Sequence, residues 1–336
     1  MRDETAARRL HSQLLSDPLP TPHAVLTHFA ALQAQDYLGA LWAVGARTLS
    51  STEADVERAI ADKQIVRCWP MRGTLHFVAA EDVRWMLALC APRALARHRT
   101  RLERDFALDL RALRRCRDVA EKALHGRALT RTEFYAALEA KRIDTKNGRG
   151  LQIVFALAHE RVLCFGARRG KQPAFVLLDD WLPPAPELPR DEALSRLAQR
   201  YFRAHAPATA ADLAWWSGLA MSDAKRAMEM IEMPSPPPSR KSSVHLLPPF
   251  DEYTVGYRDR AAVLDAEDAK RINAGGGIIH AIVVIDGRVA GRWSRTIRGN
   301  RVSIELQPFR AFTARETRAL AAASRRYATF LGLPII

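Results

Sequence analysis

The fold is indicated most directly by residues 128–181, which read ALTRTEFYAALEAKRIDTKNGRGLQIVFALAHERVLCFGARRGKQPAFVLLDDW. Thr130 and Thr132 are suitable N-cap residues for a helix over 133–138. A pair of glycines then precedes a second run of helically spaced apolar residues over 151–158. The sequence therefore predicts two successive helices in this stretch.

The same stretch ends in a predicted β-hairpin. Residues 162–165 and 174–178 are short apolar strand candidates, and the basic segment 166–171 joins them. A further helix precedes the stretch and ends near His125-Gly126. Three helices followed by a two-stranded hairpin form a winged helix, which is a variant of the DNA-binding helix-turn-helix.

A second copy of this order begins at Asp191. After a first helix and a break, a second helix is expected over 210–216, and Ser222 is expected to cap a third. The proline-rich segment 234–238 stands where the first wing strand would lie and should be loop. The shared order indicates an internal repeat, although similar cap positions also arise by chance in helical proteins.

Residues 1–118 have the pattern of a longer, diverged version of the same winged-helix order. The sequence pattern changes again after Pro249. In the first part we expect helices over 8–15, 22–32 and 53–62, strands over 66–69 and 74–78, and a helix from Glu81. In the last part we expect strands over 280–284 and 288–293 around an Asp-Gly turn, a strand over 302–306 and a helix over 314–330.

The predicted fold class is therefore α+β and mainly helical, with three tandem winged-helix modules and a C-terminal β-rich domain. The expected domains are 1–118, which contains the candidate active site, 119–185, 190–248 and 249–336. Three modules in one chain favour a monomer over the short dimeric regulators that use a single winged helix.

The chain is strongly basic. It has 336 residues, with 51 Lys and Arg against 37 Asp and Glu, a formal net charge of +14, and a pI near 10.2. Most of the cations are Arg, whose planar guanidinium suits two-point contact with phosphate. A polyanionic partner, most simply nucleic acid, is therefore predicted. A genome of high GC content would also enrich Arg, Ala and Leu.

Several classes of protein are disfavoured by the sequence. The apolar run 278–285 is too short to span a bilayer, and the charged N-terminus lacks a signal-peptide core, so we expect a cytoplasmic protein. The cysteines form no CxxC pair, which disfavours a zinc site and favours roles as small core residues. These are Cys68, Cys90, Cys116 and Cys164. No cofactor or metal is predicted.

Three arginine-rich clusters are candidates for DNA contact, although a charge run is also typical of an ordinary solvated face. One lies on a predicted helix, one at the wing tip, and one around Trp293. The candidates are Arg97 and Arg101, then Arg168, Arg169 and Lys171, then Arg292, Arg295 and Arg298. Such groups would hold phosphates, while a basic hairpin could enter a groove.

The sequence Gln33-Ala34-Gln35 carries two carboxamides two residues apart. On a helix they could not share a face, whereas on an extended segment they would point the same way. By itself this spacing is a weak signal, and glutamines near a helix end are usually surface or capping residues.

Five segments resemble one family, the bacterial winged-helix DNA glycosylases of the AlkZ/YcaQ type. They cover nearly the whole chain in the family's order. They are residues Leu32–Gln35, Arg72–Phe77, Tyr201–Gly218, Leu246–Tyr253 and Asp286–Trp293.

The resemblance implies a fold, an activity and a site. It implies tandem winged helices and a β-rich domain arranged as a C-shaped DNA clamp. It also implies removal of bulky N7-alkylpurines and unhooking of interstrand crosslinks. The family's motif is Gln-apolar-Gln or Gln-apolar-Asp, and Gln33-Ala34-Gln35 matches the first form, that of the AlkZ-like subgroup associated with self-resistance to DNA-alkylating natural products. Asp36 is one position late for the second form.

The chemistry of such a substrate explains how two glutamines can be enough. An N7-alkylated purine is cationic and departs as a neutral base, so the leaving group needs no protonation. A carboxamide can hold a water and direct partial negative charge at the developing oxocarbenium sugar, but it is no general base. We expect Gln35 to orient the water, and Gln33 to support it or contact the DNA backbone.

Other polar residues have weaker support. His76 would either face the DNA cleft or hydrogen-bond in the core, and we assign it, with Arg72 and Thr74, a supporting or DNA-positioning role. Asp251 and Glu252 could form a general base or metal pair, but beside Tyr253 they more readily order a domain junction. Trp215 and Trp216 point in different directions on a helix, so at least one should be core.

Two other functions are compatible with parts of the sequence. A winged-helix regulator without catalysis would share the basic modules, and a hydrolase using Asp251 and Glu252 would act on another substrate. The absence of lysine beside the glutamine motif argues against a Schiff-base lyase step. The leading prediction is therefore a monofunctional glycosylase acting on damaged double-stranded DNA.

Overall fold

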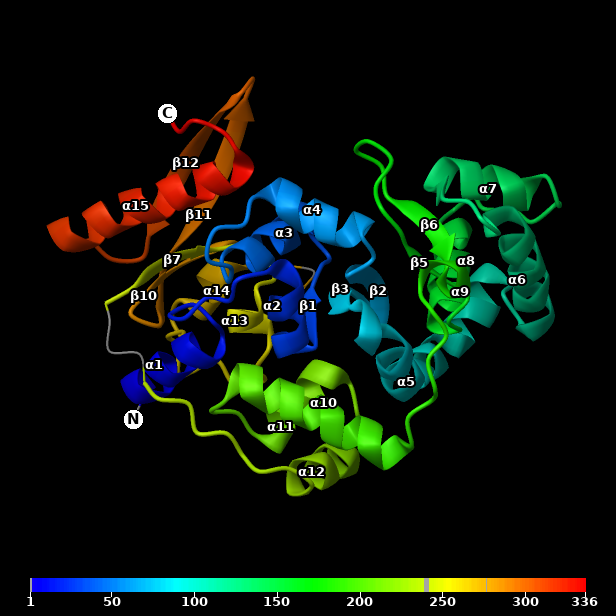
Figure 1. The fold of residues 1–336 in the computed structure, drawn as a ribbon, viewed down its shortest axis with the longest axis horizontal. Coiled ribbons are helices and arrows are strands. Elements are labelled where there is room, and N and C mark those ends of the chain that lie inside the picture. Colours follow the sequence, from blue (N-terminus) through cyan, green and yellow to red (C-terminus); the bar gives the residue numbers. More distant parts are fainter. Residues whose placement is uncertain (1, 239–241, 276) are drawn as a thin grey trace.

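The computed structural model describes residues 2–238, 242–275 and 277–336 (Figure 1). The described chain is α+β and mostly helical, with an antiparallel sheet near the C-terminus, as predicted. None of the helices within these ranges is long and apolar enough to cross a membrane.

In the N-terminal segment, Gln33 is the last residue of a short strand, and Gln35 lies in the connection between that strand and the next helix. The elements of this segment are α1 (Arg2–Ser12), α2 (Pro22–Phe29), β1 (Ala31–Gln33), α3 (Tyr37–Gly45), α4 (Glu53–Ala61), β2 (Ile65–Met71), β3 (Thr74–Ala79) and α5 (Ala80–Phe106). The helix expected over 22–32 was too long, because Ala30 has φ 67° and turns the chain out of α2. Thr52 caps α4 as predicted, in a capping box with Asp55.

The second segment has the predicted order of helices followed by a hairpin. Its elements are α6 (Leu110–Leu124), β4 (Leu129–Thr130), α7 (Arg131–Glu139), α8 (Arg149–His159), β5 (Leu163–Phe165), β6 (Ala174–Leu177) and α9 (Leu178–Trp181). Thr130 forms a capping box with Glu133, which explains why α7 begins where the sequence predicted.

The third segment repeats the helices without a wing strand. It contains α10 (Arg190–His205), α11 (Ala210–Ser217) and α12 (Met221–Glu229). The prediction of Ser222 as a cap was wrong, since α12 begins at Met221 and Ala220 occupies the cap position without a side-chain hydrogen bond. The proline-rich residues 234–238 form no strand, as expected.

The C-terminal segment is built around a long hairpin. Its elements are β7 (Val244–Leu247), α13 (Glu252–Val255), α14 (Ala269–Ile272), β8 (Asn273–Gly275), β9 (Ile278–Ile279), β10 (Ile282–Ile285), β11 (Arg288–Arg298), β12 (Arg301–Pro308) and α15 (Ala314–Leu331). The Asp-Gly turn is confirmed by positive φ angles of 49° at Asp286 and 85° at Gly287. β11 is longer than predicted and pairs with β12 from Gly291 to Arg298.

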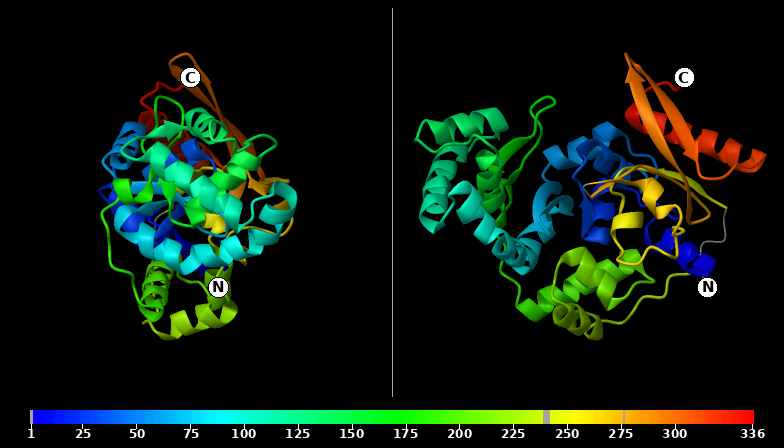
Figure 2. Two further views of the ribbon diagram at one scale, coloured as in Figure 1. Left: turned by 90° about the vertical axis from the view of Figure 1, so that its right-hand side faces the viewer. Right: turned by 180° about the vertical axis from the view of Figure 1, so that it is seen from behind.

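Two sheets connect segments that are distant in sequence. The larger has the order β1-β3-β2-β5-β6-β4, so its strands come from both sides of residue 118. The smaller has the order β12-β11-β10-β7, and its edge strand β7 comes from the stretch before residue 249. Hairpin β11–β12 and α15 lie at one end of the molecule, and helices α6–α8 lie at the other (Figure 2). Strand β1 lies between these two ends.

Strand β1 is fixed because two hydrophobic cores meet along it. Leu32 and Ala34 belong to a core shared with α15 and the C-terminal strands. Ala31 belongs to a second core that joins β2, β3 and α5 to α10–α12. Alternate residues of an extended segment point to opposite faces, so a slip of one residue would exchange these partners and bury the glutamines.

Candidate active site

The two glutamines of the motif lie at the end of a strand and just beyond it. Gln33 is the last residue of β1 and pairs with His76 of β3. Gln33 is half-buried and Gln35 is exposed. The backbone N–H of Leu75 donates to Gln35 Oε1 at 3.3 Å, and a donor at this point requires the amide oxygen, so the orientation of the carboxamide is set. The Gln33 side chain has no hydrogen bond within the described ranges.

The main chain between the glutamines is held by a buried arginine. Arg67 donates to the carbonyl oxygen of Ala34 through Nε at 3.0 Å and Nη2 at 2.8 Å. Its guanidinium lies 5.3 Å from the ring centre of Tyr37 and 5.0 Å from that of Phe165. Burial lowers the pKa of Arg67 to about 10, which leaves it charged at neutral pH. Arg67 was not predicted as a site residue, although a cation inside an apolar strand is a signal.

A second unpredicted contact comes from the C-terminal segment. The backbone N–H of Gln33 donates to Glu252 Oε1 at 3.1 Å. Trp216 Nε1 donates to the other oxygen, Oε2, at 3.0 Å, and His205 Nε2 lies 3.3 Å from it. Glu252 is 1% exposed, so its carboxylate is a structural acceptor rather than an accessible base.

The surroundings of Glu252 keep it ionised. Burial raises the pKa of Glu252, but the hydrogen bond with His205 and the positive charge of Arg72 lower it by more, so the net shift is downward. A buried charge is tolerated only when partners compensate it in this way.

Of the three supporting residues predicted around the motif, His76 is the one that pairs with Gln33 across the strands. His76 is fully buried, and its Nδ1 lies 2.9 Å from the carbonyl oxygen of Thr74, so Nδ1 carries the proton and Nε2 is an acceptor. Burial first, and the charge of Arg72 second, lower the pKa of His76 to about 4. His76 Nε2, Thr74 Oγ1, and Arg72 Nε and Nη2 are buried without a hydrogen-bond partner among the described residues.

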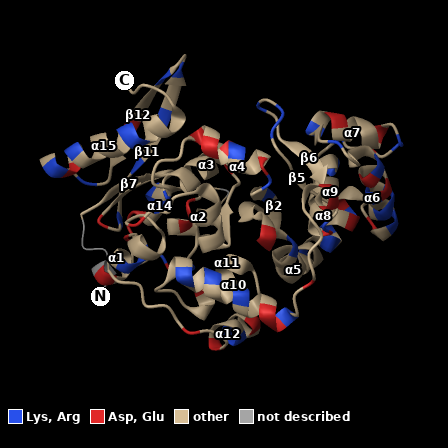
Figure 3. Cartoon of the chain, in the orientation of Figure 1, with Lys and Arg blue, Asp and Glu red and all other residues tan. Residues whose placement is uncertain are grey.

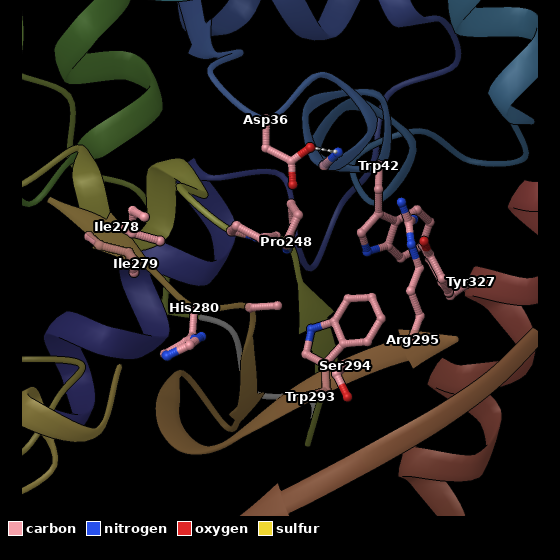
Figure 4. Close-up of a pocket in the computed structure, with 13 residues that line it drawn as sticks. Asp36, Trp42, Pro248, Ile278, Ile279, His280, Trp293, Ser294, Arg295 and Tyr327 are labelled. Atoms are coloured by element: carbon pink, nitrogen blue, oxygen red, sulfur yellow. Dashed lines mark hydrogen bonds between the residues drawn. The ribbon is translucent and has the colours of Figure 1, made fainter. Parts of the chain in front are cut away.

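One pocket includes a residue of the motif, and another includes the residue that follows it. Gln35 lines one of about 440 Å³, which also includes Trp69 and Phe155. The next residue, Asp36, lines another of about 270 Å³ near the base of β11 (Figure 4). In this second pocket the ring centres of Trp42 and Tyr327 are 5.0 Å apart. Two consecutive residues, Gln35 and Asp36, therefore line two different pockets.

The predicted DNA-contacting arginines fall into paired and unpaired groups. At the wing tip, Arg168 forms an ion pair with Glu57 at 3.2 Å, and Arg169 forms one with Glu133 at 2.6 Å. Lys171 beside them is exposed. These two ion pairs tie the wing to α4 and α7, so most of its charge is already compensated.

The other two clusters are less compensated. On α5, Arg97 is exposed and has no ion pair within the described chain. The side chain of Arg101 is 58% exposed, and its ion pair with Asp105 is long, at 3.9 Å. On β11, Arg292 donates to Gln307 Oε1 at 2.7 Å, and Arg295 lies over the ring of Tyr327. Arg298 is exposed at the tip of hairpin β11–β12, where Figure 3 shows a concentration of cations.

The remaining candidates are structural. Asp251 forms a fully buried ion pair with Arg47 at 2.8 Å and caps α13, which fits the domain-junction interpretation. Trp216 is buried and Trp215 is 47% exposed, in line with the prediction that at least one is core. All four cysteines are buried. In the described ranges, no group of three or more His, Cys, Asp or Glu is placed to hold a metal.

Comparison with known proteins places this arrangement in a family. The family model for AlkZ-like DNA glycosylases matches residues 26–330. An interstrand DNA cross-link repair glycosylase of Streptomyces sahachiroi is 27% identical over 327 residues, with 85% of this chain and 86% of that protein covered. The solved structure of Streptomyces sahachiroi DNA glycosylase AlkZ has the same fold, with a TM-score of 0.79 at 23% identity, over 99% of this chain and 98% of that one. The chain therefore belongs to the family of AlkZ-like DNA glycosylases.

Proposed function

We propose that this protein is a monofunctional DNA glycosylase that hydrolyses the N-glycosidic bond of bulky N7-alkylpurines and unhooks interstrand crosslinks. The observation that carries the proposal is the placement of Gln33 at the end of β1, paired with the buried His76, and of Gln35 two residues later, held by Leu75 at the edge of a pocket. The name of the Streptomyces sahachiroi relative, a cross-link repair glycosylase, supports the same substrate class.

The chemistry proceeds without a protonated leaving group. The positive charge of an N7-alkylpurine is relieved when the base departs, so the enzyme must supply a placed water and stabilise the sugar cation. Leu75 holds Gln35 Oε1 through one lone pair and leaves the other to accept a hydrogen bond from the attacking water. Gln33, supported by Glu252 behind it, directs partial negative charge toward the sugar.

No Schiff base enters this scheme. Among the described residues, the side chains that hydrogen-bond to the main chain of Gln33, Ala34 and Gln35 are those of Arg67 and Glu252, and neither is an amine nucleophile. The product of the reaction is therefore an abasic site rather than a cleaved strand.

The DNA is held, in this proposal, by a C-shaped clamp of three tandem winged-helix modules and the C-terminal domain, acting as a monomer. The order of helices and hairpin in 119–185, and its partial repeat in 190–248, support the modules. The exposed arginines of α5 and of the hairpin tip are the best placed to hold phosphates, because the wing arginines are already paired.

The direct test is excision of a single N7-methylguanine from duplex DNA, with abasic sites detected as alkali-labile breaks. We expect Gln33→Ala and Gln35→Ala to lower the excision rate by at least about 100-fold, the effect typical of removing one transition-state interaction, while DNA affinity changes little. Gln64→Ala, an exposed glutamine outside the site, is the matched control. Full activity in both motif variants would end the assignment. Binding without excision by the wild type would favour a non-catalytic regulator.

A further inference from the structure

The loop that joins β5 to β6, residues 166–173, forms the wing tip and reaches from the second segment to α4 of the first (Figure 1). Its basic sequence is typical of a DNA contact, but Arg168 is turned toward the protein, with its side chain only 21% exposed. Nη1 of Arg168 pairs with Glu57 Oε1 at 3.2 Å, and Nη2 donates to the carbonyl oxygen of Lys171 at 2.6 Å. Both terminal nitrogens therefore already have acceptors within the protein.

Glu57 joins this arginine to the first residue of α3. Its other oxygen, Oε2, accepts a hydrogen bond of 2.7 Å from the hydroxyl of Tyr37. The guanidinium of Arg168 also lies 4.8 Å from the ring centre of Tyr37. Burial first, then the hydrogen bond and charge of Glu57, raise the pKa of Tyr37, so its hydroxyl keeps the proton that it donates. The carboxylate and the ring thus share one guanidinium, which fixes them relative to each other.

Tyr37 in turn contacts the arginine that holds the motif. The guanidinium of Arg67 lies 5.3 Å from the ring centre of Tyr37 and donates twice to the carbonyl oxygen of Ala34, the residue between the two glutamines. Strand β5 reaches the same arginine, because Phe165 pairs with Arg67 across the sheet. The wing is therefore connected to Arg67 twice, once by strand pairing and once through Tyr37.

These contacts act over a short distance on the reacting groups. Tyr37 follows Gln35 by two residues and begins α3, so its position sets where the motif segment ends. Without Arg168, the carboxylate of Glu57 would lose its counter-charge, and the ring of Tyr37 would lose one of the two cations beside it. A misplacement of about 1 Å at a reacting group can lower a rate by about 100-fold, so even a small movement here should slow catalysis.

We propose that Tyr37, Glu57 and Arg168 form a bridge of positioning residues, through which the wing of the second segment fixes the main chain that carries the two glutamines. The inference rests on the proposed glycosylase function. In this arrangement Arg168 acts on the motif rather than on a DNA phosphate. Its neighbour Arg169 is paired with Glu133 on α7 and has no part in the bridge.

The test breaks the bridge at each of its members and leaves Arg67 and the glutamines in place. The variants are Tyr37→Phe, which removes only the hydroxyl, Glu57→Gln, which removes the charge, and Arg168→Ala. Arg169→Ala is the matched control, since it removes a paired arginine from the same wing tip. Single-turnover excision of N7-methylguanine at saturating enzyme measures the rate, and anisotropy over a range of salt concentrations measures duplex affinity. Thermal unfolding shows whether each variant is folded.

We expect each bridge variant to lower the saturated excision rate by about tenfold and to change duplex affinity by less than about twofold, because a positioning contact acts on the reacting geometry and not on DNA binding. A residue that only stabilised the fold would lower the unfolding temperature and leave the rate of the folded enzyme unchanged. The double variant Tyr37→Phe, Arg168→Ala should be no slower than Arg168→Ala alone, because both changes break the same chain of contacts. Arg169→Ala should keep the wild-type rate.

Two results would overturn the positioning role and leave the glycosylase intact. If Arg168→Ala reduces the slope of log K against log salt by roughly 0.9 and Glu57→Gln tightens binding, Arg168 is a phosphate ligand that Glu57 occupies in the free protein. If all three variants excise at the wild-type rate, the bridge only joins the segments. Tyr37→Phe alone decides between these roles if Arg168→Ala fails to fold. Wild-type protein that excises no N7-methylguanine would refute the proposed function instead.

Discussion

The contacts of Gln35 fix its side-chain oxygen, rather than its amide nitrogen, against the main chain. The Leu75 N–H holds Oε1 in place, and a carboxylate oxygen would accept the same bond. The resemblance to glycosylases with an acid at this position in a second subgroup agrees with this view. The amide nitrogen of Gln35 is therefore expected to matter less than its oxygen.

We predict that Gln35→Glu retains excision of N7-methylguanine to within about tenfold, whereas Gln35→Leu reduces it by at least about 100-fold, because only glutamate keeps an acceptor for both Leu75 N–H and the water. Single-turnover excision with excess enzyme measures the difference. Inactivity of the glutamate variant equal to that of the leucine variant would assign the role to the amide N–H group.

A second residue-scale prediction concerns Glu252, whose two oxygens meet donors from Gln33 and Trp216. In Glu252→Gln one donor must face an amide N–H₂, which leaves a buried polar group unsatisfied and should cost about 1–3 kcal/mol of the free energy of unfolding. The same substitution should displace Gln33, so the folded molecules of the variant should excise the base more slowly than the wild type.

Urea unfolding and single-turnover excision test this change, with Glu229→Gln, at an exposed site, as the control. A positioning role requires that kcat falls while DNA affinity stays near that of the wild type. If excision by the folded variant matches the wild type, Glu252 stabilises the fold without positioning Gln33.

The glutamine motif could be named as a candidate site from the sequence, but the groups that hold it could not. Gln33 and Gln35 form a short pattern that the family resemblance made recognisable. Arg67 and Glu252 reach the motif from 33 and 219 residues away in the chain, and side-chain interactions over such separations depend on the packing of the whole molecule. The sequence favoured a domain-junction role for Glu252, but it did not indicate the strand that Glu252 contacts.

At the scale of elements, the residues that cap helix N-termini were predictable, but the point where α2 ends was not. Thr52, Thr130 and Thr209 each begin a helix through a capping box, a pattern that is local and readable. The end of α2 is different. Ala30 adopts φ 67° without the glycine that usually marks such a turn, so an apolar run read as a longer helix actually divides into α2 and β1.

Hairpin β11–β12 is the element with the clearest predicted role in DNA affinity. Arg298 and Arg301 face each other across the strands at its exposed tip, with no ion pair to either among the described residues. Uncompensated like charges at a tip favour contact with phosphate. By contrast, Arg169 is paired with Glu133 and would have to exchange a partner to bind DNA.

We predict that the double variant Arg298→Ala, Arg301→Ala weakens duplex binding and reduces the slope of log K against log salt by about two, because each arginine that neutralises a phosphate contributes roughly 0.9 to that slope. Arg169→Ala should leave the slope unchanged. Fluorescence anisotropy over a range of salt concentrations measures both. A change of slope in the Arg169 variant, with none in the double variant, would move DNA contact from the hairpin to the wing.

At the scale of the whole molecule, buried histidines should make the fold sensitive to acid. Burial lowers the pKa of His28, His76 and His159 to about 4, and that of His245 to about 3. In the unfolded chain the pKa of each is about 6.5, so the unfolded state binds protons first as the pH falls. Their contribution to stability is complete above about pH 6.5 and is lost progressively toward pH 4.

We therefore predict that the urea concentration at half-unfolding decreases when the pH is lowered from 7.5 to 5.0. His159→Leu should make this decrease smaller, because it removes one group that must be buried uncharged. His125→Gln, whose side chain is 81% exposed in the wild type, should leave the decrease unchanged. A midpoint that does not depend on pH in this range would show that these histidines are compensated.

The architecture was predictable to the level of segments and their order, but not to the level of how segments join. The net charge and the repeated helices came from composition and local pattern. The six-stranded sheet joins strands from both sides of residue 118, and such pairing follows from tertiary packing rather than from any local signal. Periodicity identifies a strand but not its neighbour.

The hydrogen bond from Gln33 to Glu252 makes the motif depend on a distant part of the chain. The motif lies near the start of the chain, while the acceptor that steadies it lies near residue 250, and Trp216 and His205 hold that acceptor. A gene fragment that encodes only the first segment would carry both glutamines without their support. We therefore expect the first segment alone, without the rest of the chain, to lack the contact that positions Gln33.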